Sequence, residues 1–164
     1  MVLAGTEVDI KANGELDYSD SILQTLDIVV ASVHSSLNQN KEEMTDRIIK
    51  AIENENVDII GHPTGRIIHR RYEVKLDFDK VFSAAKKHNK FLEINANIER
   101  LDLNDVHIKD AIDKGVKLVI NTDAHSVDSL DYIKLGIGQS RRGWAKKSDI
   151  INTLSYNEFK KILN

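Results

Sequence analysis

Residues 27–34 read Asp-Ile-Val-Val-Ala-Ser-Val-His, a nearly continuous apolar run that ends in a histidine. Such a run, rich in Val and Ile, is typical of a strand covered on both faces, as in a parallel sheet. Similar short apolar runs occur at residues 57–61, 91–94 and 117–120, and a more polar strand is predicted within residues 2–10. The sequence therefore predicts five strands.

Helices are predicted between the strands because apolar residues recur there every three or four positions. Residues 41–54 are the clearest case, since Met44 and Ile48 share one face. Ser155 and Glu158 have the spacing of a capping box, which marks the start of the last helix. The other predicted helices cover residues 20–26, 77–88, 105–114 and 126–135.

Strict alternation of strands and helices indicates an α/β fold with a parallel sheet and outer helices. Five strands fit an open doubly wound sheet or part of a closed barrel, and the pattern alone leaves both open. The chain has no linker, repeat or low-complexity segment, so we expect residues 1–164 to form a single unit.

Composition excludes several classes of protein. The 164 residues are 41% hydrophobic with a net charge of −3, which is not the composition of a disordered chain. No run of about 18 apolar residues occurs, so no membrane-spanning helix is expected. The absence of cysteine excludes disulfides and thiolate metal sites and fits a cytoplasmic location. With this net charge, contacts to DNA require a local basic patch.

Chemically active residues follow the predicted strands, where parallel α/β folds build their sites. Three of the six histidines, His34, His62 and His125, come at or just after strand ends, together with Glu7 and Asp123. Imidazole and carboxylate ligands suit zinc, manganese or iron. Asp123 and His125 point to the same side if the backbone between them is extended. We therefore predict a metal site.

Other residues near these strand ends have a structural interpretation as well. A single histidine after a strand is commonly structural, and His69, His88 and His107 are predicted to be surface or structural residues. Glu93 is interpreted as a ligand, as a member of a salt bridge or as a hydrogen-bonded residue of the barrel. Asp9 is a candidate to support a ligand from behind.

Arginines provide candidate phosphate contacts, because the guanidinium group can bind phosphate oxygens in a bidentate manner. Arg66 lies four residues after His62 in the loop Gly-His-Pro-Thr-Gly-Arg. Arg141 precedes Trp144 in the run Arg-Arg-Gly-Trp. Both are predicted to bind phosphate, and Arg66 is the better candidate because it lies close to His62. A solvated charged loop is an equally good interpretation of Arg70, Arg71, Arg141 and Arg142.

Taken in order, these motifs resemble the polymerase and histidinol phosphatase (PHP) domain. They are most similar to the C-terminal PHP domain of bacterial and archaeal family X DNA polymerases. The resemblance covers almost the whole chain. Its carriers are Gly-Thr-Glu-Val-Asp-Ile (5–10), Leu-Asp-Tyr (16–18), Ala-Ser-Val-His-Ser (31–35), Gly-His-Pro-Thr-Gly-Arg (61–66), Glu-Ile-Asn-Ala-Asn (93–97), Arg-Leu-Asp-Leu (100–103), Thr-Asp-Ala-His (122–125) and Arg-Arg-Gly-Trp (141–144).

The resemblance implies a TIM-like, distorted (β/α)7 barrel with up to three divalent metal ions, Mn²⁺ or Zn²⁺, at its C-terminal face. It implies that Glu7 bridges two metals and that His34 and His62 complete one of these sites. Asp123 and His125 would serve the remaining two sites, so that Glu7, Asp123 and His125 act in catalysis. The implied reaction is phosphoester hydrolysis, as in a 3′–5′ exonuclease or related processing of a DNA 3′ end by a parent polymerase.

The chain departs from the family pattern in one respect. PHP domains open with a His-x-His motif on the first strand, and this sequence has none. We therefore expect residues 1–164 to be the C-terminal portion of a PHP domain, a truncated barrel of about five strands. The edge strand left open would favour pairing with a second copy.

Three functions remain open. The first is a metal-dependent phosphoesterase, which is expected of the parent protein. The 164 residues alone are expected to bind one ion weakly and to be nearly inactive. The second is a non-catalytic DNA-binding or scaffolding module. The third is a small-molecule phosphatase of the histidinol phosphatase type.

Overall fold

A computed structural model describes residues 2–163; Met1 and Asn164, the ends of the expected 1–164 unit, lie outside the described residues. Its five strands form one sheet in which all neighbouring pairs are parallel. This confirms the predicted α/β class with five parallel strands. The strands are β1 (Gly5–Asp9), β2 (Ile28–Ser32), β3 (Ile59–Ile60), β4 (Phe91–Asn95) and β5 (Leu118–Asn121).

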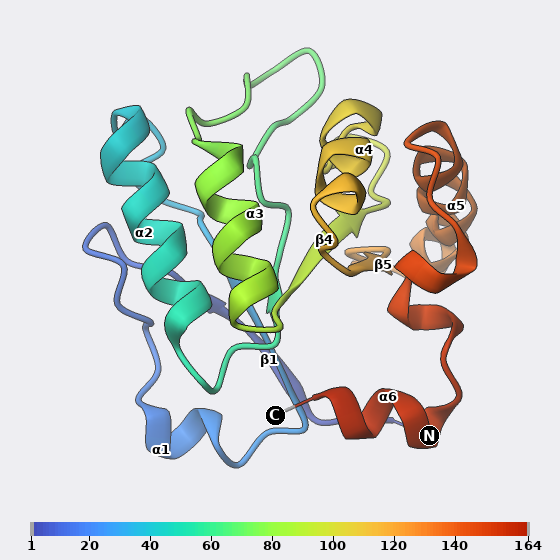
Figure 1. The fold of residues 1–164 in the computed structure, drawn as a ribbon, viewed down its shortest axis with the longest axis horizontal. Coiled ribbons are helices and arrows are strands. Elements are labelled where there is room, and N and C mark those ends of the chain that lie inside the picture. The colour runs from blue at the N-terminus through green and yellow to red at the C-terminus, as the bar shows by residue number, and fades with distance from the viewer. Residues whose placement is uncertain (1, 164) are drawn as a thin grey trace.

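Helices alternate with these strands, and Figure 1 shows α2 and α3 side by side over the sheet. The first turn of α2 is fixed by a capping box, in which Asn40 accepts from the Glu43 N–H and the Glu43 side chain accepts from the Asn40 N–H. The helices are α1 (Asp20–Leu23), α2 (Lys41–Glu53), α3 (Phe78–Lys87), α4 (Asp105–Asp113), α5 (Ile133–Arg142) and α6 (Tyr156–Ile162), with 3₁₀ helices η1 (Asp128–Tyr132), η2 (Lys147–Asp149) and η3 (Ile151–Thr153).

The spatial order of the strands follows their order in the chain, β1-β2-β3-β4-β5. An open doubly wound sheet reverses its order at a switch point, because its two halves wind in opposite directions. The observed order has no reversal, so right-handed crossovers place the connecting helices on one face. The sheet is therefore consistent with part of a TIM-like barrel.

Side chains alternate between two environments along each strand. One set, including Ala31, Ile60 and Leu92, packs in the main core with residues from the helices. The opposite face has an apolar cluster of Ile59, Phe91, Val119 and Ile151, on which Phe159 of α6 packs. Figure 1 shows α6 and α1 at the same end of the molecule. This second face is apolar toward the start of the strands, and its polar residues lie toward their ends.

The predicted helix over residues 126–135 is wrong in its bounds. The structure has η1 at Asp128–Tyr132 and then α5, which continues through two glycines to Arg142. Gly136 lies where α5 crosses the sheet, and a Cβ there would be 2.4 Å from Cγ2 of Ile120. Glycine is used here for close packing, so it does not end the helix.

The outer edge of β5 is partly satisfied by a side chain. Asn152 accepts from the Ile120 N–H at 2.7 Å and donates to the Ile120 carbonyl at 2.9 Å. The amide group thus replaces a neighbouring backbone, which limits the exposure of unpaired polar groups on this edge.

Within residues 2–163, the helices are all too short or too polar to cross a lipid bilayer.

Candidate metal centre

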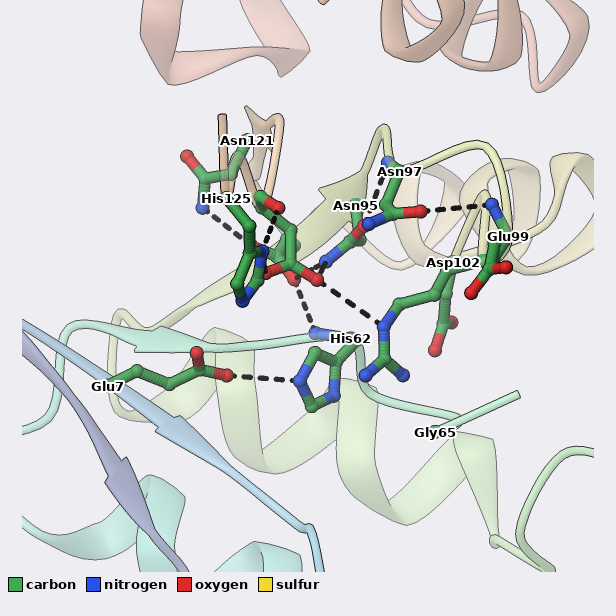
Figure 2. A network of polar contacts seen from close by, with 12 residues as sticks. Glu7, His62, Gly65, Asn95, Asn97, Glu99, Asp102, Asn121 and His125 are labelled. Atoms are coloured by element: carbon green, nitrogen blue, oxygen red, sulfur yellow. Dashed lines mark hydrogen bonds and ion pairs between the residues drawn. The ribbon is translucent and has the colours of Figure 1, made fainter. Parts of the chain in front are cut away.

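Glu7, His34 and His62 converge at the carboxyl ends of the first three strands. Nε2 of His62 lies 3.0 Å from Oε1 of Glu7, and Nε2 of His34 lies 3.5 Å from the same oxygen. The two Nε2 atoms are 3.2 Å apart. Figure 2 shows Glu7 of β1 and His62, which follows β3, facing each other. Each side chain therefore offers one ligand atom, and all three atoms lie within 4.8 Å of one another.

The register of the sheet explains why these residues meet. Glu7 pairs with Val30 in β2, and Val30 pairs with Ile59 in β3. His34 and His62 each follow the end of their strand by two residues. Both therefore lie beyond this row of paired residues, toward the carboxyl ends of the strands. Their separations of 27 and 28 residues along the chain thus become contacts.

His34 is held by a second carboxylate. Its Nδ1 lies 2.5 Å from Oδ1 of Asp9, which leaves Nε2 facing Glu7 and His62. Asp9 shares the face of Glu7 because the two residues are two apart in a strand. A carboxylate behind an imidazole is the usual arrangement for a metal-bound histidine, where it fixes the ring and raises its basicity.

The charges of this cluster are strongly coupled. Hydrogen bonds from His34 and then His62 hold the pKa of Glu7 well below its ordinary value. The hydrogen bond to Glu7, helped by that to Asp9, raises the pKa of His34 to about 9. Glu7 is therefore ionised at neutral pH, and a proton on His34 partly balances the two acids in the absence of a cation.

The backbone of His62 is held in place by a hydrogen bond to Glu93. The His62 N–H donates to Oε2 of Glu93 at 2.5 Å, and the residue has a positive φ of 25°. Gly61 allows β2 and β3 to approach, because a Cβ at this position would be 2.4 Å from Oγ of Ser32. As a result, the His62 side chain is only 3% exposed.

Glu93 accepts hydrogen bonds inside the sheet, which was one of the alternatives predicted for it. It accepts from the His62 N–H, from Nδ2 of Asn95 at 3.1 Å and from Nδ2 of Asn121 at 2.8 Å. Burial raises the pKa of this carboxyl. Figure 2 shows Asn95 and Asn121 on the neighbouring strands. The sequence placed Asn95 in the Glu-Ile-Asn-Ala-Asn motif without predicting a role for it, and Asn121 was missed, although an asparagine in an otherwise apolar strand was a signal for it.

Asp123 and His125 follow β5 and lie outside the three-residue ligand group found among residues 2–163. Asp123 has a positive φ of 51°, so the extended backbone assumed for this pair is wrong. Its Oδ2 lies 3.2 Å from Nδ2 of Asn95 and 3.4 Å from Nε of Arg100. The His125 side chain is 84% exposed, and its Nδ1 is 2.8 Å from the Asp123 carbonyl oxygen.

The two arginines predicted to bind phosphate have different surroundings. Arg66 donates through Nε to the Arg100 carbonyl at 2.8 Å and also to the Leu101 carbonyl, so it holds the following loop in place. Arg141 is exposed in the last turn of α5. Our sequence reasoning missed Arg100, whose guanidinium faces Asp123.

Two of the remaining histidines are structural or exposed, as predicted. The His107 ring stacks on Phe78 with ring centroids 3.7 Å apart, and its Nε2 lies 3.3 Å from Glu73. His69 is exposed in the loop after β3. Both residues are thus separate from the Glu7, His34 and His62 cluster.

Comparison with known proteins extends this picture, although no family model matches the chain. The predicted resemblance is confirmed, because the chain is homologous to probable phosphatases of the PHP family. It is 39% identical over 134 residues to one from Thermoanaerobacter sp. and 37% identical over 145 residues to one from Shewanella frigidimarina. These alignments cover 76% and 83% of this chain, and 52% and 56% of the two phosphatases.

A polymerase relative matches along nearly the whole chain. The DNA polymerase/3′-5′ exonuclease PolX of Bacillus subtilis is 44% identical over 162 residues, which is 99% of this chain. The match covers 28% of PolX. The chain therefore spans about half the length of the phosphatases and just over a quarter of PolX.

Proposed function

We propose that the chain is part of a metal-dependent phosphoesterase of the PHP type, most similar in function to a 3′–5′ exonuclease or 3′-end-processing module. Residues 1–164 would form the C-terminal portion of that domain. The main observation in support is that Glu7, His34 and His62 converge on one point at the carboxyl ends of parallel strands. The homology to PolX and to probable phosphatases supports the same reaction class.

These residues fit a divalent cation such as Mn²⁺ or Zn²⁺. Two imidazole nitrogens and one carboxylate oxygen form a ligand set that both ions accept, and Asp9 already holds the His34 ring from behind. When bound, the cation would activate water and stabilise charge on a phosphoryl group. The protein contributes the fixed positions of Oε1 of Glu7 and of both Nε2 atoms.

Asp123 and His125 would serve further ions, up to three in a complete site. Asp123 is held beside the cluster by Asn95 and Arg100. His125 is exposed at the same end of the sheet and is free of close packing. We propose that the isolated chain binds one divalent ion at Glu7, His34 and His62. It would hydrolyse phosphoesters slowly or not at all. A DNA 3′ end would be the substrate of the parent protein.

Metal analysis of the purified chain tests the site directly. We expect about one Mn²⁺ or Zn²⁺ per chain by elemental analysis after equilibration, and loss of this metal in His34→Ala. His69→Ala is the matched control, because His69 is exposed and outside the cluster. Stoichiometric metal retained by His34→Ala would overturn the assignment.

The substrate class is tested separately with Mn²⁺ present. A 3′-labelled oligonucleotide and histidinol phosphate are offered to the chain and to a longer relative such as PolX. Release of 3′ nucleotides supports the exonuclease proposal, whereas preference for histidinol phosphate identifies a small-molecule phosphatase.

A non-catalytic DNA-binding role is the second candidate, favoured by a cavity of about 620 Å³ lined by residues 66–73. Arg66, Arg70 and Arg71 lie in this wall, and Arg70 also pairs with Glu99 at 3.1 Å. Oligonucleotide binding that persists in EDTA and is lost in Arg70→Glu would support it, and unchanged binding would exclude this loop as the DNA contact.

A further inference from the structure

A second large cavity lies at the end of the sheet opposite to the candidate metal centre. Its volume is about 1200 Å³. Phe91, the first residue of β4, and Lys117, which precedes β5, are part of its wall. The last turns of α3 and α6 and the segment around η2 complete it. The candidate metal centre lies at the carboxyl ends of the strands. The cavity and the metal centre are therefore at opposite ends of the sheet.

The wall of this cavity is strongly basic, although the chain has a net charge of −3. Among residues 2–163, Glu158 is the one carboxylate in the wall, and it already accepts from the N–H and hydroxyl of Ser155 in the capping box of α6. Six lysines face this single acid: Lys86, Lys90, Lys117, Lys146, Lys147 and Lys161.

Stabilisation of helix ends accounts for only part of this charge. Lys86 and Lys161 lie in the last turns of α3 and α6, where a cation is favoured by the helix dipole. Lys146 is instead the N-cap residue of the short 3₁₀ helix η2, Lys147 is its first residue, and Lys117 precedes a strand. These three lysines approach the same cavity without an α-helix C-terminus to stabilise, which raises the cost of like-charge repulsion.

Two of the lysines are anchored by the backbone. Nζ of Lys90 donates to the Glu55 carbonyl at 3.0 Å, and Nζ of Lys117 donates to the Ser148 carbonyl at 2.8 Å. Lys90 is 5% exposed, so its ammonium group is held in the wall with little water around it. Asp58 and Glu55 lie close enough to offset part of the charge of Lys90, whereas the carbonyl that holds Lys117 neutralises none of its charge. An anion in the cavity would compensate the positive charge that remains in the wall.

The wall also has an apolar part formed by Phe91, Ile151, Leu154 and Ile162. Ligand sites usually combine an apolar surface with a few fixed polar groups. A ligand that carries both phosphates and a flat apolar group matches this combination. The volume is sufficient for one or two nucleotides.

We propose that this lysine-lined cavity is a nucleotide-binding site, in which the lysines contact phosphates and a base lies on the apolar wall. The ligand is a free nucleotide or a single-stranded DNA segment, which share this chemistry. The site needs no metal and is distinct from the proposed phosphoesterase centre.

Binding is measured in EDTA, with dTTP as the free nucleotide and a fluorescent ten-residue oligo(dT) as the single strand. The pocket variant combines Lys147→Glu with Lys161→Glu, and the control variant combines Lys75→Glu with Lys134→Glu, which changes net charge equally outside the cavity. We expect at least one probe to bind about tenfold more weakly to the pocket variant, with the control within about twofold.

Both probes failing to bind the unmodified chain would overturn the proposal, as would equal weakening in the two charge-reversed variants. Loss of binding in Arg70→Glu but not in the pocket variant would place the nucleotide elsewhere and also overturn it. If the double variant fails to fold by circular dichroism, the single Lys147→Gln variant replaces it. Chemical shifts of Ile151 and Ile162 provide a second readout, and no shift on addition of the bound probe contradicts the proposed site.

Discussion

Asp9 sets the orientation of the His34 ring, and its effect on metal affinity can be separated from its effect on folding. Its side chain is half exposed, so its removal leaves no buried gap. We expect Asp9→Ala to weaken metal binding about 10–100-fold, the usual effect of losing such a supporting carboxylate. Titration calorimetry with Mn²⁺ measures this.

Asp17→Ala is the matched control for Asp9, because Asp17 is also exposed and its ion pair with Lys11 lies outside the cluster. The control should bind metal as the unmodified chain does. Equal affinities in all three proteins would show that Asp9 does not support the ligand.

Asp102 introduces a pH dependence of stability. It is fully buried, Oδ2 accepts from the Thr64 N–H at 3.0 Å, and burial raises its pKa from 3.8 to about 6. A carboxyl whose pKa is raised by folding binds its proton more tightly in the folded state. Its favourable contribution is therefore complete below about pH 4 and is lost as the pH rises through about 6.

Asp102→Asn removes this titration while keeping a side-chain oxygen that can accept from Thr64. The free energy of unfolding of the variant, relative to the unmodified chain, should rise between pH 4 and pH 7 by on the order of 2–3 kcal/mol. Urea unfolding in EDTA at both pH values measures the difference. A difference that stays constant with pH would contradict the assignment.

At the scale of single elements, α5 contains two glycines with opposite roles. A Cβ on Gly136 would lie 2.4 Å from Cγ2 of Ile120 and 2.9 Å from Cβ of Ala96, whereas nothing lies within 4 Å of a Cβ on Gly138. We expect Gly136→Ala to lower the free energy of unfolding by about 1–3 kcal/mol through overpacking. Gly138→Ala should raise it by up to about 1 kcal/mol through helix propensity.

The two alanine variants control for each other, since the substitution and the helix are the same. Thermal and urea unfolding should place them on opposite sides of the unmodified chain. Equal effects would mean that α5 does not pack on β5 as described.

The elements themselves were largely predictable, and α5 shows where prediction ends. Apolar runs at residues 27–33 and 117–120 identified β2 and β5 because a strand buried on both faces needs apolar side chains throughout. The end of α5 was not predictable, because a glycine that permits close packing looks the same in the sequence as one that ends a helix. The difference lies in Ile120, which is distant in the chain.

The candidate site divides in the same way. His34 and His62 were predictable from their places after apolar runs, and a parallel register brings them to Glu7. The left-handed backbone at Asp123 and the amides Asn95 and Asn121 depend on contacts across strands. Such contacts leave no periodic signal.

At the scale of the whole molecule, the two outer strands of the sheet differ in protection. Asn152 pairs with Ile120 on the edge of β5, whereas β1 is the first strand in the sheet order. We propose that β1 pairs with a second copy of the chain at high concentration. Sedimentation velocity should show a rising average mass with concentration, in EDTA as well as with Mn²⁺. A constant monomer mass at all concentrations would contradict this.

The division of the second sheet face into an apolar and a polar half separates two kinds of mutational constraint. Around Ile59, Phe91 and Phe159, shape and volume matter, so exchanges among hydrophobic residues of similar size should be tolerated. Both carboxylate oxygens of Glu93 have named donors, so even an isosteric exchange of Glu93 breaks a contact. We therefore expect one end of these strands to accept hydrophobic residues of similar size and the other end to accept few substitutions.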